Sequence, residues 1–350
     1  MEKYSVILAG GDGTRFWPLS RRNMPKQFLN ITGNDIMINE TVKRCQNVIP
    51  YKNTFIITNK EQLKYLKDIL NYDVPRENIL VEPLKKNTSA CIAYAAIVLK
   101  KEYEDAVMAV LPSDHYIKNQ KAFETILSKA CDVAQNTNKM ISIGIKPSFP
   151  STAYGYIKYS SKELEIAKGV YEVEDFIEKP DMIKAEGLFK NGKYLWNSGI
   201  YVWKVSVILN NIKRYLPKLY NTLNTIYDYI GTAEEKDKLQ NIYSNIKSIS
   251  IDYGVIERSD DVLVVPGDFG WNDIGSWDAV GLVMPNDDYG NIVKGKHIGV
   301  KTNNCIIYGK DKLIATIGAN DLIIVDSSNA MLICKKRTSS GSKKYSQNSK

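Results

Sequence analysis

Short β-branched runs alternate with longer amphipathic stretches over about the first 270 residues of this 350-residue chain, and this alternation restricts the fold most. The runs are typical of buried strands, and we expect these at residues 4–9, 55–58, 79–81, 107–111 and 140–145. Helical spacing of apolar residues predicts helices at 36–48, 61–70, 88–103 and 122–134. Strand–helix–strand alternation predicts an α/β, Rossmann-like fold, with a mostly parallel sheet and helices on both faces.

The pattern changes after residue 285. The segment 285–290 is rich in turn residues, and short β runs follow at 297–301, 304–308, 312–317, 322–325 and 331–334. No helical pattern separates them, which predicts a small all-β unit. No strict repeat period decides between a β-solenoid and a meander. We therefore divide the chain into a large domain (1–285), a small β domain (286–335) and a tail (336–350).

The net charge of +8 is concentrated at the C-terminal end. Residues 335–350 hold six Lys or Arg and no acid, which leaves +2 for the rest of the chain. The body therefore has no basic footprint for nucleic acid. The polar, low-complexity tail is expected to be disordered and solvated, with an electrostatic arm for RNA or anionic lipid as the alternative. The longest apolar run, residues 91–99, is less than half of the ~20 residues a membrane span needs. No signal peptide is read, so a cytoplasmic protein is expected.

The few cysteines and histidines restrict the metals that the chain could hold. Five cysteines are widely spaced without a C-x-x-C pair, and there are only two histidines, His115 and His297. This argues against a disulfide framework and against a zinc cluster. A metal would be held by carboxylates, which points to Mg²⁺.

The first strand runs into a glycine-rich loop, Ala9-Gly-Gly-Asp-Gly-Thr-Arg15. Three glycines in four positions let backbone N–H groups converge on an anion. The loop is neither G-x-G-x-x-G nor a Walker A motif. Arg15 can fork onto phosphate oxygens, and Lys26 adds a point charge further along.

The run LAGGDGTRFWPLSRRNMPKQFL, starting at Leu8, resembles the signature of the sugar-nucleotide pyrophosphorylases. These nucleotidyltransferases join a sugar 1-phosphate to a nucleoside triphosphate. The Trp-Pro-Leu-Ser and Met-Pro-Lys-Gln-Phe stretches are similar to those of members that transfer GMP to mannose 1-phosphate. Phe16 stands where the family usually has Leu. The resemblance implies that residues 1–285 form the catalytic domain, with Arg15 and Lys26 as catalytic residues.

The resemblance also implies a nucleotide site. Glu82-Pro83 followed by Asn87-Thr88 resembles the base-recognition segment, although Lys85-Lys86 replaces a more usual Gly-Arg. Asn87 and Thr88 also suit a helix N-cap, and both roles stay open. The implied nucleotide-binding residues are Leu8, Ala9, Gly10, Gly11, Gly13, Thr14, Arg15, Glu82, Asn87, Thr88, Ser113 and Asp114.

Two acids are implied as ligands of Mg²⁺. Asp114 follows the strand at 107–111, and an acid at this end of a central strand points into the ligand crevice. Asp273 lies in the run GDFGWNDIGSW, which matches the family closely. His115 is expected to be packed or supporting rather than catalytic.

Three further runs, at residues 152–156, 176–180 and 196–199, resemble the sugar-phosphate pocket of the family. Ala153 replaces a more usual Gly there. Glu178 and Asn197 can bond sugar hydroxyls, while Lys179 can neutralise the phosphate. The residues implied to bind the sugar phosphate are Gly155, Glu178, Lys179 and Asn197. The segment beginning at Asp252 resembles a supporting segment of that pocket.

The resemblance implies transfer of GMP from GTP to α-D-mannose 1-phosphate, giving GDP-mannose and pyrophosphate for nucleotide-sugar and polysaccharide biosynthesis. Mg²⁺ is the expected cofactor, with no organic cofactor and no nucleic-acid or membrane partner. Two alternatives remain: a nucleotidyltransferase for another sugar 1-phosphate or nucleotide, such as one acting on glucose 1-phosphate, and a non-catalytic nucleotide-sugar sensor. The sequence leaves a homodimer open.

Overall fold

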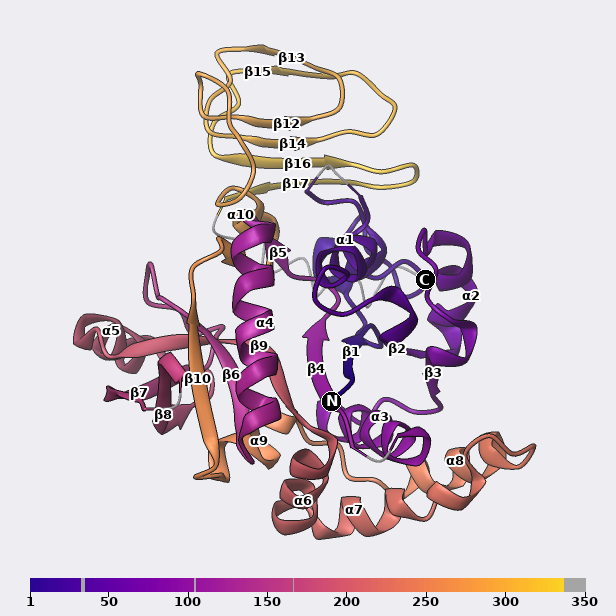
Figure 1. Ribbon diagram of the computed structural model, residues 1–350. Coiled ribbons are helices and arrows are strands. Elements are labelled where there is room, and N and C mark those ends of the chain that lie inside the picture. The colour runs from indigo at the N-terminus through magenta and orange to yellow at the C-terminus, as the bar shows by residue number, and fades with distance from the viewer. Residues whose placement is uncertain (33–34, 104, 166, 337–350) are drawn as a thin grey trace.

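A computed structural model describes residues 1–32, 35–103, 105–165 and 167–336 (Figure 1). Of the predicted tail, residues 337–350 lie outside this description. A nine-stranded sheet has the order β3-β2-β1-β4-β9-β6-β10-β8-β7. Its strands are β1 (Lys3–Leu8), β2 (Thr54–Asn59), β3 (Ile79–Glu82), β4 (Val107–Pro112), β6 (Met140–Ile145), β7 (Tyr156–Leu164), β8 (Ala167–Ile177), β9 (Tyr194–Lys204) and β10 (Val262–Gly267). The short strands β5 (Tyr116–Ile117) and β11 (Trp271–Asn272) pair separately.

Most strands of the large sheet run in one direction. β1 pairs in parallel with β2 and β4, β2 with β3, and β6 with β10. Strand β9 lies antiparallel between β4 and β6, so β6 and β10 point the same way as the first four strands. Strands β7 and β8 form an antiparallel hairpin at one edge, and β7 also pairs with β9. The predicted mostly parallel sheet is confirmed.

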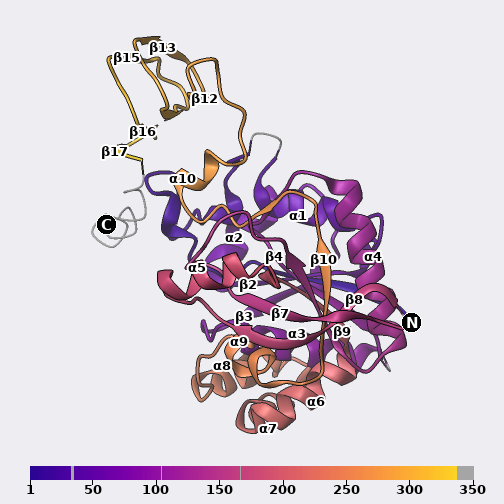
Figure 2. The same cartoon turned by 90° about the vertical axis from the view of Figure 1, so that its left-hand side faces the viewer.

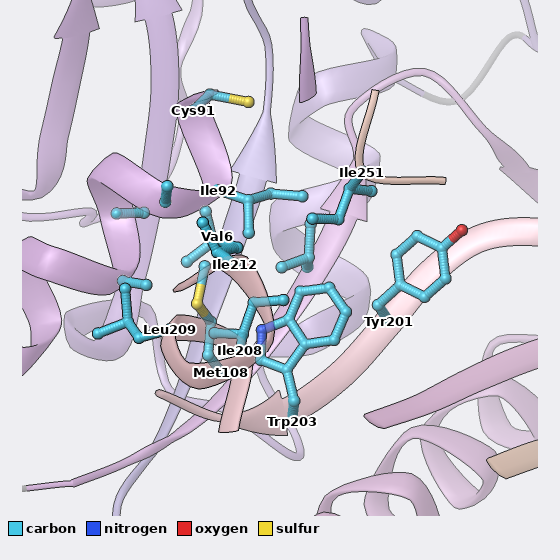
Figure 3. Packing of buried hydrophobic residues seen from close by; sticks show 14 of the residues in the cluster. Val6, Cys91, Ile92, Met108, Tyr201, Trp203, Ile208, Leu209, Ile212 and Ile251 are labelled. Atoms are coloured by element: carbon cyan, nitrogen blue, oxygen red, sulfur yellow. The ribbon is translucent and has the colours of Figure 1, made fainter. Parts of the chain in front are cut away.

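Helices cover both faces of this sheet. Consecutive strand residues point to opposite sides, so the buried strands present apolar side chains on each face. Val6 packs in one core with Ile92 and Ile208, whereas its neighbour Ile7 packs with Ile38 in another. Figure 3 shows the first of these cores, between the sheet and helices α3 and α6. The helices are α1 (Met37–Cys45), α2 (Lys60–Ile69), α3 (Thr88–Glu102), α4 (Gln120–Asn136), α5 (Met182–Asn191), α6 (Val205–Tyr215), α7 (Pro217–Asn224), α8 (Glu235–Ser244), α9 (Ile251–Gly254) and α10 (Trp277–Val280). Among the described residues, no helix is long and apolar enough to cross a membrane.

The C-terminal β unit is a small solenoid. Its strands are β12 (Ile292–Lys294), β13 (His297–Val300), β14 (Ile306–Tyr308), β15 (Ile314–Ile317), β16 (Leu322–Asp326) and β17 (Met331–Lys335). Strands β12, β14 and β16 stack in parallel, as do β13 and β15, while β17 closes the stack antiparallel to β16. Ile292, Ile306 and Ile323 lie in register although they are 14 and 17 residues apart, which is why the sequence shows no strict period.

The solenoid and the large domain share one hydrophobic cluster. Phe16, Ile274 and Trp277 of the large domain are buried in it together with Ile306 and Ile323 of the solenoid. The Phe16 and Trp277 rings lie 4.9 Å apart, centroid to centroid. Figure 2 shows the stacked strands beyond α10, at one end of the molecule. The solenoid is therefore packed directly against segments that carry predicted site residues.

Candidate active site

The site forms where β1 and β4 end side by side. Leu8 at the end of β1 lies opposite Pro112 at the end of β4, and the chain leaves both strands at the same edge. This is the point where the strand order reverses, because β2 and β3 lie on one side of β1 and β4 on the other. Ligands in such sheets bind at this position. The backbone N–H and the hydroxyl of Ser113 both donate to the carbonyl oxygen of Leu8, at 3.2 and 2.7 Å. Ser113, a predicted nucleotide-binding residue, therefore holds the two strand ends together.

Buried amide side chains hold the carbonyl groups of the glycine loop. Gln27, which is 3% exposed, donates to the oxygens of Ala9 and Gly11, both at 3.0 Å. Gln62 donates to Gly11 at 2.7 Å, and Asn59 donates to the carbonyl between them at 3.2 Å. These bonds fix the loop from its carbonyl side.

The N–H groups of the loop remain available. In the described part of the chain, no bond uses the N–H of Gly10, Gly11 or Gly13. Gly13 has φ 50°, and a Cβ there would lie 2.4 Å from the backbone nitrogen of Lys26. A side chain is therefore excluded at this position. Free N–H groups on a tight glycine loop suit a phosphate.

Lys26 is a buried cation that joins the two predicted metal ligands. Its ammonium group donates to Oδ2 and to the carbonyl oxygen of Asp114, at 3.0 and 2.7 Å, and also to the carbonyl oxygen of Asp273. Burial disfavours the charged form of Asp114, but Lys26, through its charge and its hydrogen bond, together with His115 and Arg15 outweighs it, so the pKa of Asp114 lies below its usual range. The side chain of Asp114 remains 34% exposed. Asp114 is therefore an ionised carboxylate that a ligand can reach.

Asp273 is held from a second side. Its Oδ1 accepts a bond of 2.8 Å from the hydroxyl of Tyr154. A Cβ added to Gly275 would lie 3.1 Å from Oδ2 of Asp273 and 3.5 Å from Nη1 of Arg15, which places Arg15 beside this carboxylate. Lys26 thus bonds to Oδ2 of Asp114 and Tyr154 to Oδ1 of Asp273, whereas Oδ2 of Asp273 lies on the side of Arg15.

The two carboxylates suit a magnesium ion that is shared with substrate phosphates better than a metal ion held by protein side chains alone. Within the described ranges, no three His, Cys, Asp or Glu side chains group together as metal ligands. Mg²⁺ is usually held by one or two carboxylates together with substrate phosphates and water. Asp114 and Asp273 each offer one oxygen for that arrangement.

His115 is a packed neutral histidine. Burial lowers its pKa to about 4. Its Nδ1 accepts a bond of 3.1 Å from Nε1 of Trp271, which requires that nitrogen to be unprotonated. His115 therefore supports the site and is no proton acceptor at neutral pH.

A cavity of about 250 Å³ lies beside these groups. It is also lined by residues with no predicted binding role, including His115, Tyr154, Asp252 and Trp271. The predicted residues that line it are Leu8, Arg15, Thr88, Gly155, Glu178, Lys179, Asn197 and Asp273. The predicted residues outside the lining are Ala9, Gly10, Gly11, Gly13, Thr14, Lys26, Glu82, Asn87, Ser113 and Asp114.

Glu178 and Lys179 form an ion pair on the cavity wall. The Glu178 side chain is only 5% exposed, and its Oε2 is buried without a partner in the described residues. A Cβ on Gly155 would lie 2.4 Å from that oxygen, so any larger residue there would displace the Glu178 carboxylate. Burial and the Asp252 charge raise the pKa of Glu178. The orphaned oxygen is an acceptor available to a bound hydroxyl group.

Asn197 is held in place by other side chains. Its Nδ2 donates to the hydroxyl of Tyr201 at 2.8 Å and to Oδ1 of Asp252 at 2.9 Å. Its Oδ1 accepts from the N–H of Gly199 at 3.2 Å. Asn197 thus has both amide protons engaged, and Asp252, expected only as support, itself lines the cavity.

The segment predicted to recognise the base lies beside the glycine loop, since a Cβ on Gly10 would lie 3.4 Å from Oε2 of Glu82. Glu82 is 7% exposed, and burial raises its pKa to about 8. Asn87 caps α3, because its Oδ1 accepts from the N–H of Thr88 at 2.8 Å. Oγ1 of Thr88 accepts from the N–H of Ile251 at 2.8 Å. The N-cap role is therefore present in the structure, and a base contact stays a prediction.

Comparison with known families agrees with this arrangement. Residues 4–288 match the family described as nucleotidyl transferase. The chain belongs to the nucleotidyl transferase family. Residues 295–343 match a MannoseP isomerase/GMP-like beta-helix domain, in keeping with the solenoid. The predicted membership among the sugar-nucleotide pyrophosphorylases is confirmed.

Individual relatives of this nucleotidyl transferase are similar along nearly the whole chain. The mannose-1-phosphate guanylyltransferase of Escherichia coli is 35% identical over 346 residues, 95% of this chain and 72% of that protein. The alginate biosynthesis protein AlgA of Pseudomonas aeruginosa is 36% identical over 340 residues, 95% of this chain and 69% of that protein. A crystal structure from Thermus thermophilus, described as a mannose-1-phosphate geranyltransferase, has a TM-score of 0.89 at 28% identity and 99% coverage of both chains.

The lining residues of this nucleotidyl transferase to which the sequence analysis gave no binding role include His115, Tyr154, Asp252 and Trp271. Each lies inside a segment that was singled out for another residue. Their signal was proximity, since Tyr154 adjoins Gly155 and Trp271 lies two residues before Asp273. Sequence alone could not show which side chains of those segments point into the cavity.

Proposed function

We propose that this nucleotidyl transferase moves GMP from GTP to mannose 1-phosphate, which gives GDP-mannose and pyrophosphate. The observation that carries the proposal is the buried Lys26 ammonium group, which joins Asp114 and Asp273 beside the glycine loop. The choice of mannose and GTP is supported by the relatives named mannose-1-phosphate guanylyltransferase.

The proposed reaction needs no protein base. The attacking group is a phosphate oxygen of the sugar phosphate, already ionised near pH 7 because the second phosphate pKa is about 6. This fits the neutral, packed His115. Catalysis then depends on in-line placement of the two substrates and on neutralising charge around the α-phosphorus.

The site offers donor groups or positive charge for the phosphates of both proposed substrates. The free N–H groups of the glycine loop, with Arg15, would hold the β- and γ-phosphates that leave as pyrophosphate. Lys179 would neutralise the phosphate of the sugar, while the orphaned Oε2 of Glu178 would accept a sugar hydroxyl. Asp114 and Asp273 would hold Mg²⁺, which supplies positive charge to the phosphate oxygens when bound.

A panel of substrates tests this function. Pyrophosphate release is measured with GTP, ATP, UTP and dTTP, each combined with the 1-phosphates of mannose, glucose, galactose and N-acetylglucosamine. We expect GTP with mannose 1-phosphate to give the highest kcat/KM. A higher value for another pair would replace the proposed substrates by that pair. Binding of GDP-mannose without release of pyrophosphate in any combination would favour the sensor alternative.

A further inference from the structure

Tyr154 contacts the reaction site through one carboxylate oxygen. Its hydroxyl donates to Oδ1 of Asp273 at 2.8 Å, and the residue is 9% exposed. A carboxylate oxygen only accepts hydrogen bonds, so the Tyr154 hydroxyl is the donor in this pair.

The ring of Tyr154 has little freedom to move. It packs edge-on against Trp196 and Trp271, with centroid distances of 4.9 and 5.1 Å. Trp271 is itself fixed by its bond to His115. The position of the hydroxyl is thus set by an aromatic cluster and not by the solvent.

Asp273 has a corresponding need for orientation. Its backbone is fixed, because its carbonyl oxygen accepts from Lys26 and the next residue, Ile274, has φ 41° and donates its N–H to Oδ1 of Asn272 at 2.7 Å. This leaves rotation of the carboxylate as the remaining freedom. The bond from Tyr154 stops that rotation and keeps Oδ2 on the other side of the carboxylate, toward Arg15.

Tyr154 also lies at the boundary with the sugar pocket. The carbonyl oxygen of the next residue, Gly155, accepts from the backbone N–H of Asn197 at 2.8 Å. The same glycine lies against Oε2 of Glu178. The segment that orients Asp273 is therefore continuous with the wall of the proposed sugar site.

We propose that Tyr154 is a positioning residue that orients the Asp273 carboxylate so that its Oδ2 faces the divalent cation. The proposal rests on the proposed function, since that function brings the cation and GTP to this carboxylate. It assigns Tyr154 a role through Asp273 and no contact with the reacting atoms. Hydrogen-bonded partners of metal ligands typically change metal affinity by about 10- to 100-fold when removed.

The test compares two tyrosine-to-phenylalanine variants of the full chain. Tyr154→Phe removes the bond to Asp273 and keeps the ring. Tyr156→Phe is the matched control, because Tyr156 lies in the same segment, is fully buried, and its hydroxyl accepts from the N–H of Ser151 at 2.8 Å without contact with Asp273. The readout is the Kd of Mn²⁺, measured by electron paramagnetic resonance in the presence of saturating GTP and without the sugar phosphate.

We expect Tyr154→Phe to weaken Mn²⁺ binding about 10-fold or more, while Tyr156→Phe changes it less than about 2-fold. In an Asp273→Asn background, adding Tyr154→Phe should cause no further loss. Equal Mn²⁺ affinity in wild type and Tyr154→Phe would overturn the proposal, as would equal losses in both phenylalanine variants. If the wild-type protein saturated with GTP binds no Mn²⁺, the magnesium site of the proposed function is wrong, which is a separate failure from that of the Tyr154 proposal.

Discussion

The ammonium group of Lys26 lies 3.0 Å from Oδ2 of Asp114, in an ion pair whose cation is 4% exposed and whose acid is 34% exposed. The lysine end of the pair is thus embedded in protein, and the aspartate end faces the site. A buried charge that loses its partner is costly, so each residue depends on the other.

Replacing Lys26 should affect the rate more than the binding of GTP. In Lys26→Ala we expect single-turnover rates about 10²- to 10³-fold lower, or about 3–4 kcal/mol, because the positive charge that holds Asp114 and Asp273 at the site is lost. Arg15→Ala should instead weaken GTP binding as well as the rate. Lys26→Arg should not rescue fully, since a planar guanidinium cannot replace an ammonium surrounded by three oxygens.

Calorimetry with GTP and rapid-quench kinetics on these variants separate the two roles. Loss of GTP binding in Lys26→Ala, together with normal binding and rate in Arg15→Ala, would reverse the assignment.

The carboxylates at 114 and 273 should both be needed for turnover. Asp114→Asn and Asp273→Asn keep the shape of the side chain and remove a charge that would bind the cation, so we expect severe loss of kcat at limiting Mg²⁺ with circular dichroism unchanged. Asp268→Asn is the matched control, because Asp268 lies in the same segment as Asp273 and is exposed. Full activity in both site variants would remove the metal from these residues.

The buried Glu82 should make stability fall as pH rises. Its pKa is about 8 in the folded protein, against an ordinary value of 4.5. Between these values the folded chain holds a proton that the unfolded chain has released, so the free energy of unfolding decreases with pH by up to about 1.4 kcal/mol per unit. Glu82→Gln should remove this slope.

Urea unfolding at pH 5, 6.5 and 8 measures the effect of Glu82→Gln. The control is Glu77→Gln, since Glu77 is an exposed acid close by in sequence. The interpretation fails if Glu82→Gln and wild type have parallel pH profiles.

Lys85 should compensate for an acid inside the glycine loop. Asp12 stands among the free N–H groups of that loop and forms an ion pair with Lys85, with side chains 62% and 44% exposed. Lys85→Ala should raise the Kd of GTP about 2- to 5-fold, because an unpaired carboxylate repels phosphate. Asp12→Asn added to Lys85→Ala should restore binding.

Two comparisons sharpen this cycle. Lys86→Ala removes the same charge one residue later and should change the Kd of GTP less. The effect of Lys85→Ala should shrink at about 0.5 M salt, where exposed charges are screened. If the double variant binds GTP as weakly as Lys85→Ala alone, Lys85 acts on the nucleotide directly and not through Asp12.

Local pattern predicted the first half of the fold well, because strand and helix periodicity is a property of neighbouring residues. The strands at β1 to β4 and the helices α1 to α4 all lie where their apolar spacing placed them. The strand β9 was not predicted. Its middle carries Asn197, Ser198 and Gly199, which read as a polar motif, and its place between β4 and β6 depends on contacts distant in sequence.

The candidate site shows the same division. Residue type and position after strands indicated Arg15 and Asp114 as neighbours of one ligand, and the family resemblance implied Asp273. The bonds from Lys26 to Asp114 and from Tyr154 to Asp273 could not be foreseen, because the partners are 88 and 119 residues apart in the sequence. Such pairs arise only when the sheet brings separate loops together.

Phe16, Ile274 and Trp277 share one hydrophobic cluster with the solenoid strands, so we expect unfolding of the solenoid to be coupled to unfolding of the large domain. Phe16 directly follows Arg15, and Ile274 directly follows Asp273, so the residues that carry charge in the site are anchored in the same core as the C-terminal stack. On heating, the large domain and the solenoid should therefore unfold in one cooperative transition. A relative with a different C-terminal stack would therefore need different apolar side chains at positions 16 and 274 to pack against it.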